Sequence, residues 1–478
     1  MSKKSISRRK FLQATGAAAG AATLAGCAGD ETEEATTTEA TTTTETVEKE
    51  VYKPGSLAVE ATGDYELEME LASSFHASLQ MLAYSSFSVI PEGIVGDVEG
   101  YDGEMDYQTF ATSEPIGSGP FEFENWTQGT EASVTAFDDY SGDVPNLDRV
   151  QWQVIEKDSP AFNYAMNRNA DLFAIPTTQY DPELVSVEET DAEGRQLGTY
   201  GPVRNDATLN YVGVPTINTF YIGLNAKNVP RAVRHAIAYA MDQHEGVEQV
   251  FKGRGTPAYH YSPPSIYPGG TSAYDEHAEQ NYPYGYGETR ISDARQVMED
   301  AGYDSDNTFE ITATTISGNS AYQRVFTRLQ SKLRQAHIEM DITEAEFGTI
   351  ISQAISGSME VFALGDGMEY PGPENFLRFL YGESPSGQFT RWGAEDSYHD
   401  QELRQTALDA WAENYAAEDS TSESEAEAFQ TIEEVNWLSM QELPIVNPAS
   451  QRFWHQDVDV NMYGVMENQT FTDLTLSR

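Results

Sequence analysis

The side chains that could support nucleophilic or metal-assisted chemistry are few in this 478-residue sequence. Its only cysteine is Cys27, so the chain has no internal disulfide and no cysteine-rich metal site. The eight histidines never form the HExxH pattern of a zinc protease, and neither a GxSxG nucleophile elbow nor a P-loop occurs. The run 304–307 lacks the glycine and the final glutamate of a calcium-binding loop. We therefore expect no catalytic residues, no metal, no cofactor and no enzymatic activity.

The chemistry that Cys27 offers is lipidation at the end of a leader peptide. Residues 1–26 hold five basic residues and no acid, followed over 14–26 by a run of small and apolar residues too short to span a bilayer. The stretch 7–13, with Arg8 and Arg9, resembles the twin-arginine export signal. Leu-Ala-Gly before Cys27 resembles a lipobox. We expect an exported protein held on the extracellular face of the membrane by lipid on Cys27; the alternative is that Cys27 is merely a small leader residue.

The segment 27–50 is predicted to be a disordered tether. Residues 28–50 contain nine Thr and eight Asp or Glu and almost nothing that could be buried. A tether of this kind would hold a folded body away from the membrane surface.

The charge of the whole chain is strongly negative. It has 77 acidic against 28 basic residues, a formal net charge of −49. Such a surface repels phosphate backbones, so nucleic acid is not an expected partner. At molar salt the self-repulsion is largely screened, and the composition is typical of a salt-loving, haloarchaeal-like organism. The alternative is an ordinary acidic protein.

Periodicity predicts a mixed α/β body. Apolar residues alternate over 309–313 and 338–342, and between them Val325, Phe326, Leu329 and Leu333 have helical spacing. This strand–helix–strand order indicates an α/β layer. A strand is also expected at 220–225. Further helices are expected at 231–250, 401–415 and 426–443.

Five stretches, in the right order, resemble the extracellular solute-binding proteins of the dipeptide/oligopeptide type (family 5), which are receptors of ABC importers. They are 115–121 with Trp126, 146–150, Asn225 with 233–242, 294–303, and 365–376. The resemblance covers about 51–478. It implies an α/β, two-lobed, periplasmic-binding-protein-like (type II) fold with a hinge between the lobes. Lobe I would comprise 51–215, with a remnant of a small extra domain, and 447–478; lobe II would comprise 216–446.

The same resemblance implies a function and a site. The function is capture of a peptide or other small solute and its delivery to the permease and ATPase subunits, by a monomeric receptor. Glu369 takes the place of the family's acidic residue, which pairs with the ligand's α-ammonium group by a charge-assisted hydrogen bond. Asp366 stands where the family often has Trp. The expected ligand-binding residues are Glu369, Tyr370, Asp366, Tyr261 and Tyr221. The plain alternative for Glu369 is one more surface acid, and for Tyr261 ordinary loop packing.

The sequence also departs from the family pattern. The tether runs directly into a stretch that the family places much later, so we expect part of the N-terminal lobe to be lacking. Two alternatives stay open: a secreted salt-tolerant hydrolase, which would need a nucleophile–base pair, and a degenerate, non-transporting surface lipoprotein, which would show no stabilisation by ligand.

Overall fold

The computed structural model describes residues 59–71, 76–96, 103–192, 194–380, 389–394, 397–398, 401–415, 421–461, 464–465 and 469–477. The leader 1–26, the tether 27–50 and the residues Arg8, Arg9 and Cys27 lie outside the described residues. The chain divides into two compact units, one made of Met1–His76 and Ser88–Ser118, the other of Ala77–Phe87 and Gly119–Arg478.

The described part of the first unit contains a hairpin and a short helix. Strands β1 (Val59–Gly63) and β2 (Glu66–Met69) pair antiparallel, and all their residues are exposed. Helix α3 (Tyr107–Thr112) begins where the Asp106 carboxylate accepts a hydrogen bond from the Thr109 amide at 2.8 Å. Val95 and Met105 form a parallel bridge before it.

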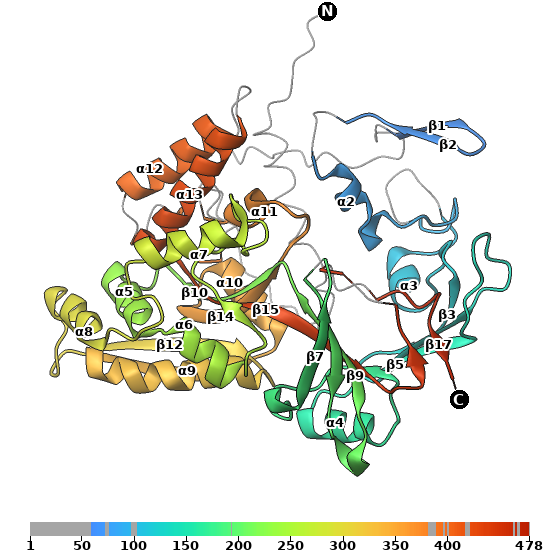
Figure 1. Ribbon diagram of the computed structural model, residues 1–478. Helices are drawn as coiled ribbons and strands as arrows, with labels where there is room; N and C mark the ends of the chain where they lie inside the picture. The colour runs from blue at the N-terminus through green and yellow to red at the C-terminus, as the bar shows by residue number, and fades with distance from the viewer. Residues whose placement is uncertain are drawn as a thin grey trace, which may run out of the picture. The chain divides into compact units, whose positions relative to one another are not determined.

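The second unit is built on a large mixed sheet. Within the described residues its order is β13-β12-β14-β10-β15-β9-β8-β7, with β11 and β6 also paired to β15 (Figure 1). Its strands are β6 (Leu172–Phe173), β7 (Val185–Thr190), β8 (Gln196–Tyr200), β9 (Leu209–Pro215), β10 (Asn218–Leu224), β11 (Gly255–Pro257), β12 (Phe309–Ile316), β13 (Ile338–Ala345), β14 (Val361–Gly367) and β15 (Glu442–Trp454). A separate three-stranded sheet holds β3 (Phe121–Thr127), β4 (Glu131–Ala136) and β5 (Arg149–Gln153), and β16 (Val458–Asp459) pairs with β17 (Thr475–Leu476).

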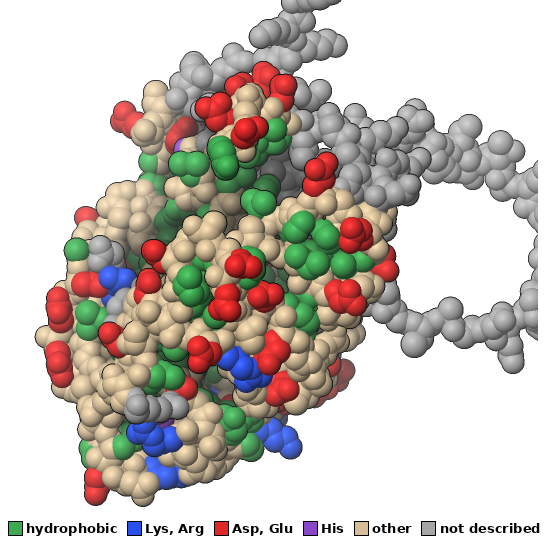
Figure 2. All heavy atoms as spheres, turned by 90° about the vertical axis from the view of Figure 1, so that its right-hand side faces the viewer, with side chains coloured by type: hydrophobic (Ala, Val, Ile, Leu, Met, Phe, Trp, Pro, Cys, Tyr) green, Lys and Arg blue, Asp and Glu red, His purple; other side chains and the backbone are tan. Residues whose placement is uncertain are grey.

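The helices of this unit mostly flank the large sheet. They are α2 (Ser78–Leu82), α4 (Asp158–Met166), α5 (Arg231–Ala240), α6 (Gln243–Glu245), α7 (Gly270–Asn281), α8 (Ile291–Asp300), α9 (Ser320–Leu333), α10 (Phe347–Ser356), α11 (Pro373–Leu377), α12 (Gln401–Asp409) and α13 (Ser422–Ser439). Among the described residues, no helix combines the length and the apolar character needed to cross a bilayer. Acidic side chains are spread over the face shown in Figure 2, whereas Lys and Arg are few there.

One large hydrophobic core lies in the half that contains the parallel strands. Strands β12 and β13 pair in parallel from Phe309 with Ile338 to Ile316 with Ala345, and α9 between them packs on both. This confirms the predicted strand–helix–strand unit. Buried residues of α5, α8 and α9 complete the core with those of the strands. Apolar alternation on the strands and helical spacing on α9 meet here because both present one face inward.

Smaller cores lie in the other half. Tyr180, Tyr200, Leu209 and Phe453 are buried together with residues of α4, and a further cluster forms around Val212, Val214 and Trp454. The two halves are joined where the chain passes from β9 to β10 and again within β15, whose first part pairs with β10 and whose last part pairs with β9. The two connecting segments are hydrogen-bonded to each other. Both the amide and the hydroxyl of Thr216 donate to the Pro448 carbonyl.

Two predicted helices were too long. The segment 231–250 breaks after α5, because Met241 is extended and the Asp242 side chain caps a new start by accepting from the Glu245 amide at 3.0 Å. The segment 426–443 ends as α13 at Ser439, where Met440 adopts a left-handed conformation. Glu442 and Leu443 already belong to β15.

Candidate ligand-binding site

The site of interest lies at one edge of the large sheet. Strands β12 and β13 are parallel, and β14 runs parallel to β12, so their carboxyl ends lie at the same edge. The segments that leave this edge are 317–319, Glu346 and 368–372, which lead into α9, α10 and α11. In open α/β sheets ligands bind outside the carboxyl ends of the strands. The residues that follow β14 include Glu369 and Tyr370 of the expected site.

Glu369 is held in a bidentate ion pair. Its two carboxylate oxygens accept hydrogen bonds from the Arg378 guanidinium, at 2.7 Å from one terminal nitrogen and 2.9 Å from the other. Asn375 fixes the same residue from the other side, because its side-chain oxygen accepts from the Glu369 amide at 2.9 Å. The Glu369 side chain keeps 31% of its surface exposed, and that of Arg378 keeps 19%. The carboxylate is therefore at the surface of the site, but it already has a cationic partner.

Asp366 lies on the face of the sheet that carries Tyr221. Asp366 is the register partner of Thr219 on β10, and Tyr221 follows two residues later on the same face. The Tyr261 hydroxyl donates to the Asp366 carboxylate at 3.3 Å, and the Tyr221 and Tyr261 rings meet edge to face with centroids 5.2 Å apart. Burial raises the pKa of Asp366 to about 7, although Arg378 and the Tyr261 hydroxyl act to lower it.

Two further acids are buried near the Tyr221 and Tyr261 pair. Glu433 on α13 accepts from the backbone amides of Tyr261 and Ser262, each at 2.8 Å, and burial raises the pKa of Glu433 to about 7. Glu442 is only 3% exposed, and one of its oxygens has no hydrogen-bond partner among the described residues. Burial, and then the charge of Asp366, raises the pKa of Glu442 well above its usual value.

The structure thus brings the five expected residues into one region. Tyr221, Tyr261 and Tyr370 are buried, whereas Glu369 and Asp366 are partly exposed. The sequence reasoning missed Arg378, Glu433 and Glu442. A signal existed for Arg378, since a basic residue is rare in this acidic chain and this one directly follows the short helix α11, nine positions after Glu369. No comparable signal marks the two glutamates among so many acids.

Tyr84 closes one side of the Glu369 segment. Its hydroxyl donates to the Met368 carbonyl at 2.9 Å, although the two residues are far apart in the sequence. Burial, and then the charge of Glu369, raises the pKa of Tyr84. The turn after α2 therefore adds a phenolic hydroxyl beside the expected site.

A cavity of about 360 Å³ lies farther along the same edge, where β12 leads into α9. Asp158 and Thr177 line it from the half that contains α4, and residues 317–321 line it from the half that contains α9. Among the described residues, no group of three or more His, Cys, Asp or Glu side chains is arranged to hold a metal ion. The site consists of paired charges, hydroxyl groups and aromatic rings.

Residues 17–388 match the family model described as bacterial extracellular solute-binding proteins, family 5 middle. The chain belongs to this family. Its curated relatives include the oligopeptide-binding protein AppA of Bacillus subtilis, 28% identical over 316 residues that cover 62% of this chain and 51% of AppA. The glutathione-binding protein GsiB of Escherichia coli K12 is 24% identical over 293 residues, which cover 60% of this chain and 49% of GsiB. The chain spans about half the length of these relatives.

Similar solved structures show the fold. Haemophilus influenzae OppA in complex with the peptide RPPGFSPFR matches with a TM-score of 0.67 at 19% identity, covering 89% of this chain and 76% of OppA. The murein tripeptide binding protein MppA of E. coli matches with a TM-score of 0.67 at 16% identity, covering 89% of this chain and 75% of MppA. The expected two-lobed, periplasmic-binding-protein-like α/β fold is therefore confirmed, with hinge strands between the lobes.

Proposed function

We propose that this chain is the solute-binding receptor of an ABC importer, which captures peptides between its two lobes and delivers them to the permease. The proposal rests on membership of family 5 together with one structural observation. Glu369, at the carboxyl end of β14, lies on the same sheet edge as the cavity bordered by both halves of the second unit. A ligand along this edge would meet a carboxylate at one end and the polar start of α9 at the other.

We assign the roles of the site residues as follows. Glu369 faces the amino end of the ligand, with Tyr370 and Asp366 beside it. Tyr261 and Tyr221 lie behind Asp366 and hold it in position, since Tyr261 donates to its carboxylate. The lobes would be 51–215 with 447–478, and 216–446. This division is supported by the two chain crossings, which lie at Thr216 and Pro448.

The finer cellular assignment belongs to the same proposal. The receptor is exported through the signal at Arg8 and Arg9, anchored by lipid on Cys27 and adapted to high salt. It works as a monomer with the permease and ATPase subunits, binds no nucleic acid and catalyses no reaction. The leader and the excess of acidic residues in the sequence support these points.

The test is peptide binding by the protein purified in molar KCl. Native mass spectrometry identifies solutes that co-purify, and calorimetry measures the affinity for peptides from dipeptides to nonapeptides. We expect at least one class of peptide to bind with a 1:1 stoichiometry, to raise the melting temperature and to be recovered with unchanged mass. Failure of every peptide to bind folded protein would contradict the proposal, and recovery of cleaved peptide would favour a hydrolase.

A further inference from the structure

The charge on Glu369 is neutralised from within the chain. Arg378 lies nine positions later, just after the five-residue helix α11. Its guanidinium donates a hydrogen bond to each of the two carboxylate oxygens. Asn375, in the middle of α11, also approaches the carboxylate, with its amide nitrogen 3.4 Å from one oxygen. A ligand ammonium that approaches Glu369 thus meets a carboxylate that already accepts two charge-assisted hydrogen bonds from Arg378.

Arg378 has little else to hold it where it is. Its guanidinium lies over the ring of Phe379, 4.7 Å from the ring centre, and its Nε is buried with no partner among the described residues. Burial acts to lower the pKa of Arg378, but the bond to Glu369 and the charges of Glu369 and Asp366 outweigh it and raise that pKa. The cation is therefore held at the site by the acids rather than by solvent.

Three charged side chains of the site act on one another. Arg378 interacts with two partly exposed acids, Glu369 in direct contact and Asp366 within electrostatic range. Removing the guanidinium would leave Glu369 without its strong donor and would leave the ligand ammonium as the natural replacement. A carboxylate in that state discriminates between a cation and a neutral group much more strongly than an internally paired one.

We propose that Arg378 is a specificity-determining residue, an internal counter-ion that occupies the cation position at Glu369 and makes the site tolerant of peptides without a free amino terminus. This inference rests on the proposed function and names its substrate class, which includes N-terminally blocked peptides as well as free ones. A purely structural Arg378 would instead support the fold of the 366–378 segment and would affect all ligands alike.

The experiment compares a free peptide with its N-acetylated form by calorimetry at high salt. The readout is the ratio of the two dissociation constants, acetylated over free. In wild type we expect a ratio within about threefold of one, and in Arg378→Gln a ratio about tenfold higher, as expected for a hydrogen bond to a charged group. The double variant Glu369→Gln with Arg378→Gln should return to the wild-type ratio.

Two more variants separate discrimination from folding. Arg328→Gln removes a guanidinium from another glutamate, Glu245, on a different part of the same half, and it should leave the ratio unchanged. Arg378→Lys keeps the charge but loses the bidentate fork, and its ratio should lie between those of wild type and Arg378→Gln. It serves as the main variant if Arg378→Gln does not fold.

The outcomes are distinct. A wild-type ratio already far above the expected range, an unchanged ratio in both Arg378 variants, or an equal loss of affinity for both peptides would overturn the role of Arg378 while leaving the receptor function intact. Absence of any peptide binding to wild type would overturn the proposed function and this inference with it.

Discussion

The ring of Phe362 lies directly against Gly223 on the neighbouring strand. The two residues are register partners in the pairing of β14 with β10. A Cβ built at Gly223 would lie 2.2 Å from the Cζ atom of Phe362, which is too close for any side chain. Phe362 is fully buried and meets Tyr221 edge to face at 6.5 Å between centroids. The glycine therefore allows the ring to lie flat on the face that carries the candidate site.

The first prediction follows from this contact. Gly223→Ala should lower the free energy of unfolding by about 1–3 kcal/mol, because an overpacked core forces side chains or backbone to shift. Gly348→Ala in α10 is the matched control, since nothing lies within 4 Å of its added Cβ, and it should raise stability by roughly 0.5–1 kcal/mol. Denaturant unfolding measures both. Equal effects from the two substitutions would show that the Phe362 contact is not restrictive.

The second prediction concerns pH and Asp366. Its pKa of about 7 in the folded protein is above the usual value of 3.8. The native state therefore keeps a proton that the unfolded chain has lost, and the contribution of Asp366 to stability is lost as pH rises from about 4 to about 7. Asp366→Asn removes this loss. Relative to wild type, it should gain roughly 1–2 kcal/mol in stability between pH 5 and pH 8.

The control for this prediction is Asp341→Asn, an exposed acid on β13. Its stability should follow the wild-type curve over the same pH range. A difference between Asp366→Asn and wild type that stays constant from pH 5 to pH 8 would contradict the raised pKa of Asp366. Some pH dependence should persist in Asp366→Asn, because the pKa of Glu433 is also raised to about 7 by burial.

Helices and strands could be predicted from the sequence where a single hydrophobic periodicity matches the packing of the element. The strand at 309–316, the helix at 320–333 and the strand at 338–345 each present one apolar face to a single core. The prediction failed where a local contact ends a helix although the hydrophobic pattern continues. The apolar pattern continues through Met241, but the extended backbone there and the cap by Asp242 end α5.

For the site, the family resemblance identified Glu369 and Asp366 as candidate residues. It did not show which side chains hydrogen-bond to them. Tyr261 reaches Asp366 across 105 positions of sequence, and Glu433 reaches the Tyr261 amide across 172. Such pairs depend on how α13 and the loop after β11 fold onto the sheet. Arg378 is closer in sequence, but only the turn at 371–372 and α11 bring it back to Glu369. No local sequence pattern specifies this contact between Arg378 and Glu369.

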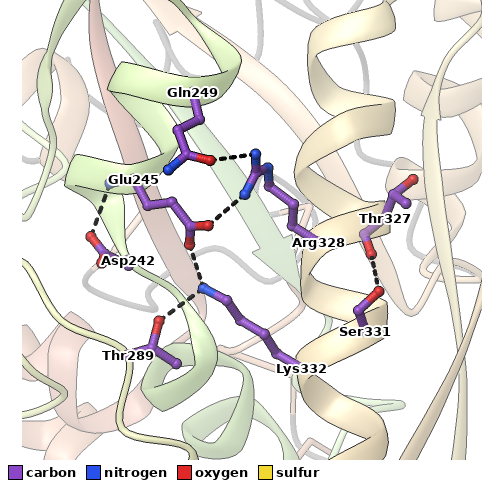
Figure 3. Close-up of polar contacts among 8 residues, drawn as sticks. All are labelled: Asp242, Glu245, Gln249, Thr289, Thr327, Arg328, Ser331 and Lys332. Atoms are coloured by element: carbon purple, nitrogen blue, oxygen red, sulfur yellow. Dashed lines mark hydrogen bonds and ion pairs between the residues drawn. The ribbon is translucent and has the colours of Figure 1, made fainter.

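The third prediction tests an ion network that connects α9 to the short helix α6. Glu245 accepts from Arg328 at 2.5 Å and from Lys332 at 2.6 Å, two contacts that Figure 3 draws as dashed lines. Lys332 also donates to Thr289 at 2.8 Å. Glu245→Gln should destabilise the protein by about 1–2 kcal/mol at pH 7, since it removes a charge shared by two cations that are only partly exposed.

The pH dependence of this variant has a definite sign. Burial acts to raise the pKa of Glu245, but Lys332 and Arg328 outweigh it and lower that pKa. The stabilising contribution is therefore present above about pH 4.5 and is lost as pH falls further. A double-mutant cycle with Lys332→Met should give a coupling energy of about 0.5–1 kcal/mol. Strict additivity of the two substitutions would contradict a shared network.

The fourth prediction concerns the leader and the anchor. Cys27→Ser should leave export intact but release the protein into the medium, because the lipid acceptor is gone. Replacing Arg8 and Arg9 together by Lys should instead block export, since that pair is the signal read by the export machinery. Fractionation of cells and medium with an antibody to the folded body measures both. A Cys27→Ser protein that stays as tightly membrane-bound as wild type would rule out the lipid anchor.

The fifth prediction concerns salt. The formal charge of −49 makes the folded chain repel itself, and the screening length shrinks from about 10 Å at 0.1 M salt to about 3 Å at 1 M. The melting temperature should rise by about 5–10 °C over this range, which corresponds to a few kcal/mol at this chain length. Sucrose at matched osmolality separates screening from general exclusion of a cosolute, because it stabilises without screening charge. KCl should therefore raise the melting temperature well above the rise that sucrose gives, and NaCl should match KCl.

The Glu245–Lys332 pair should respond to salt in the opposite direction, since screening weakens a partly exposed ion pair. The destabilisation by Glu245→Gln should accordingly be smaller at 1 M than at 0.1 M salt. A melting temperature that is flat in KCl, or a rise equalled by sucrose, would show that repulsion between the acids does not limit the stability of this fold.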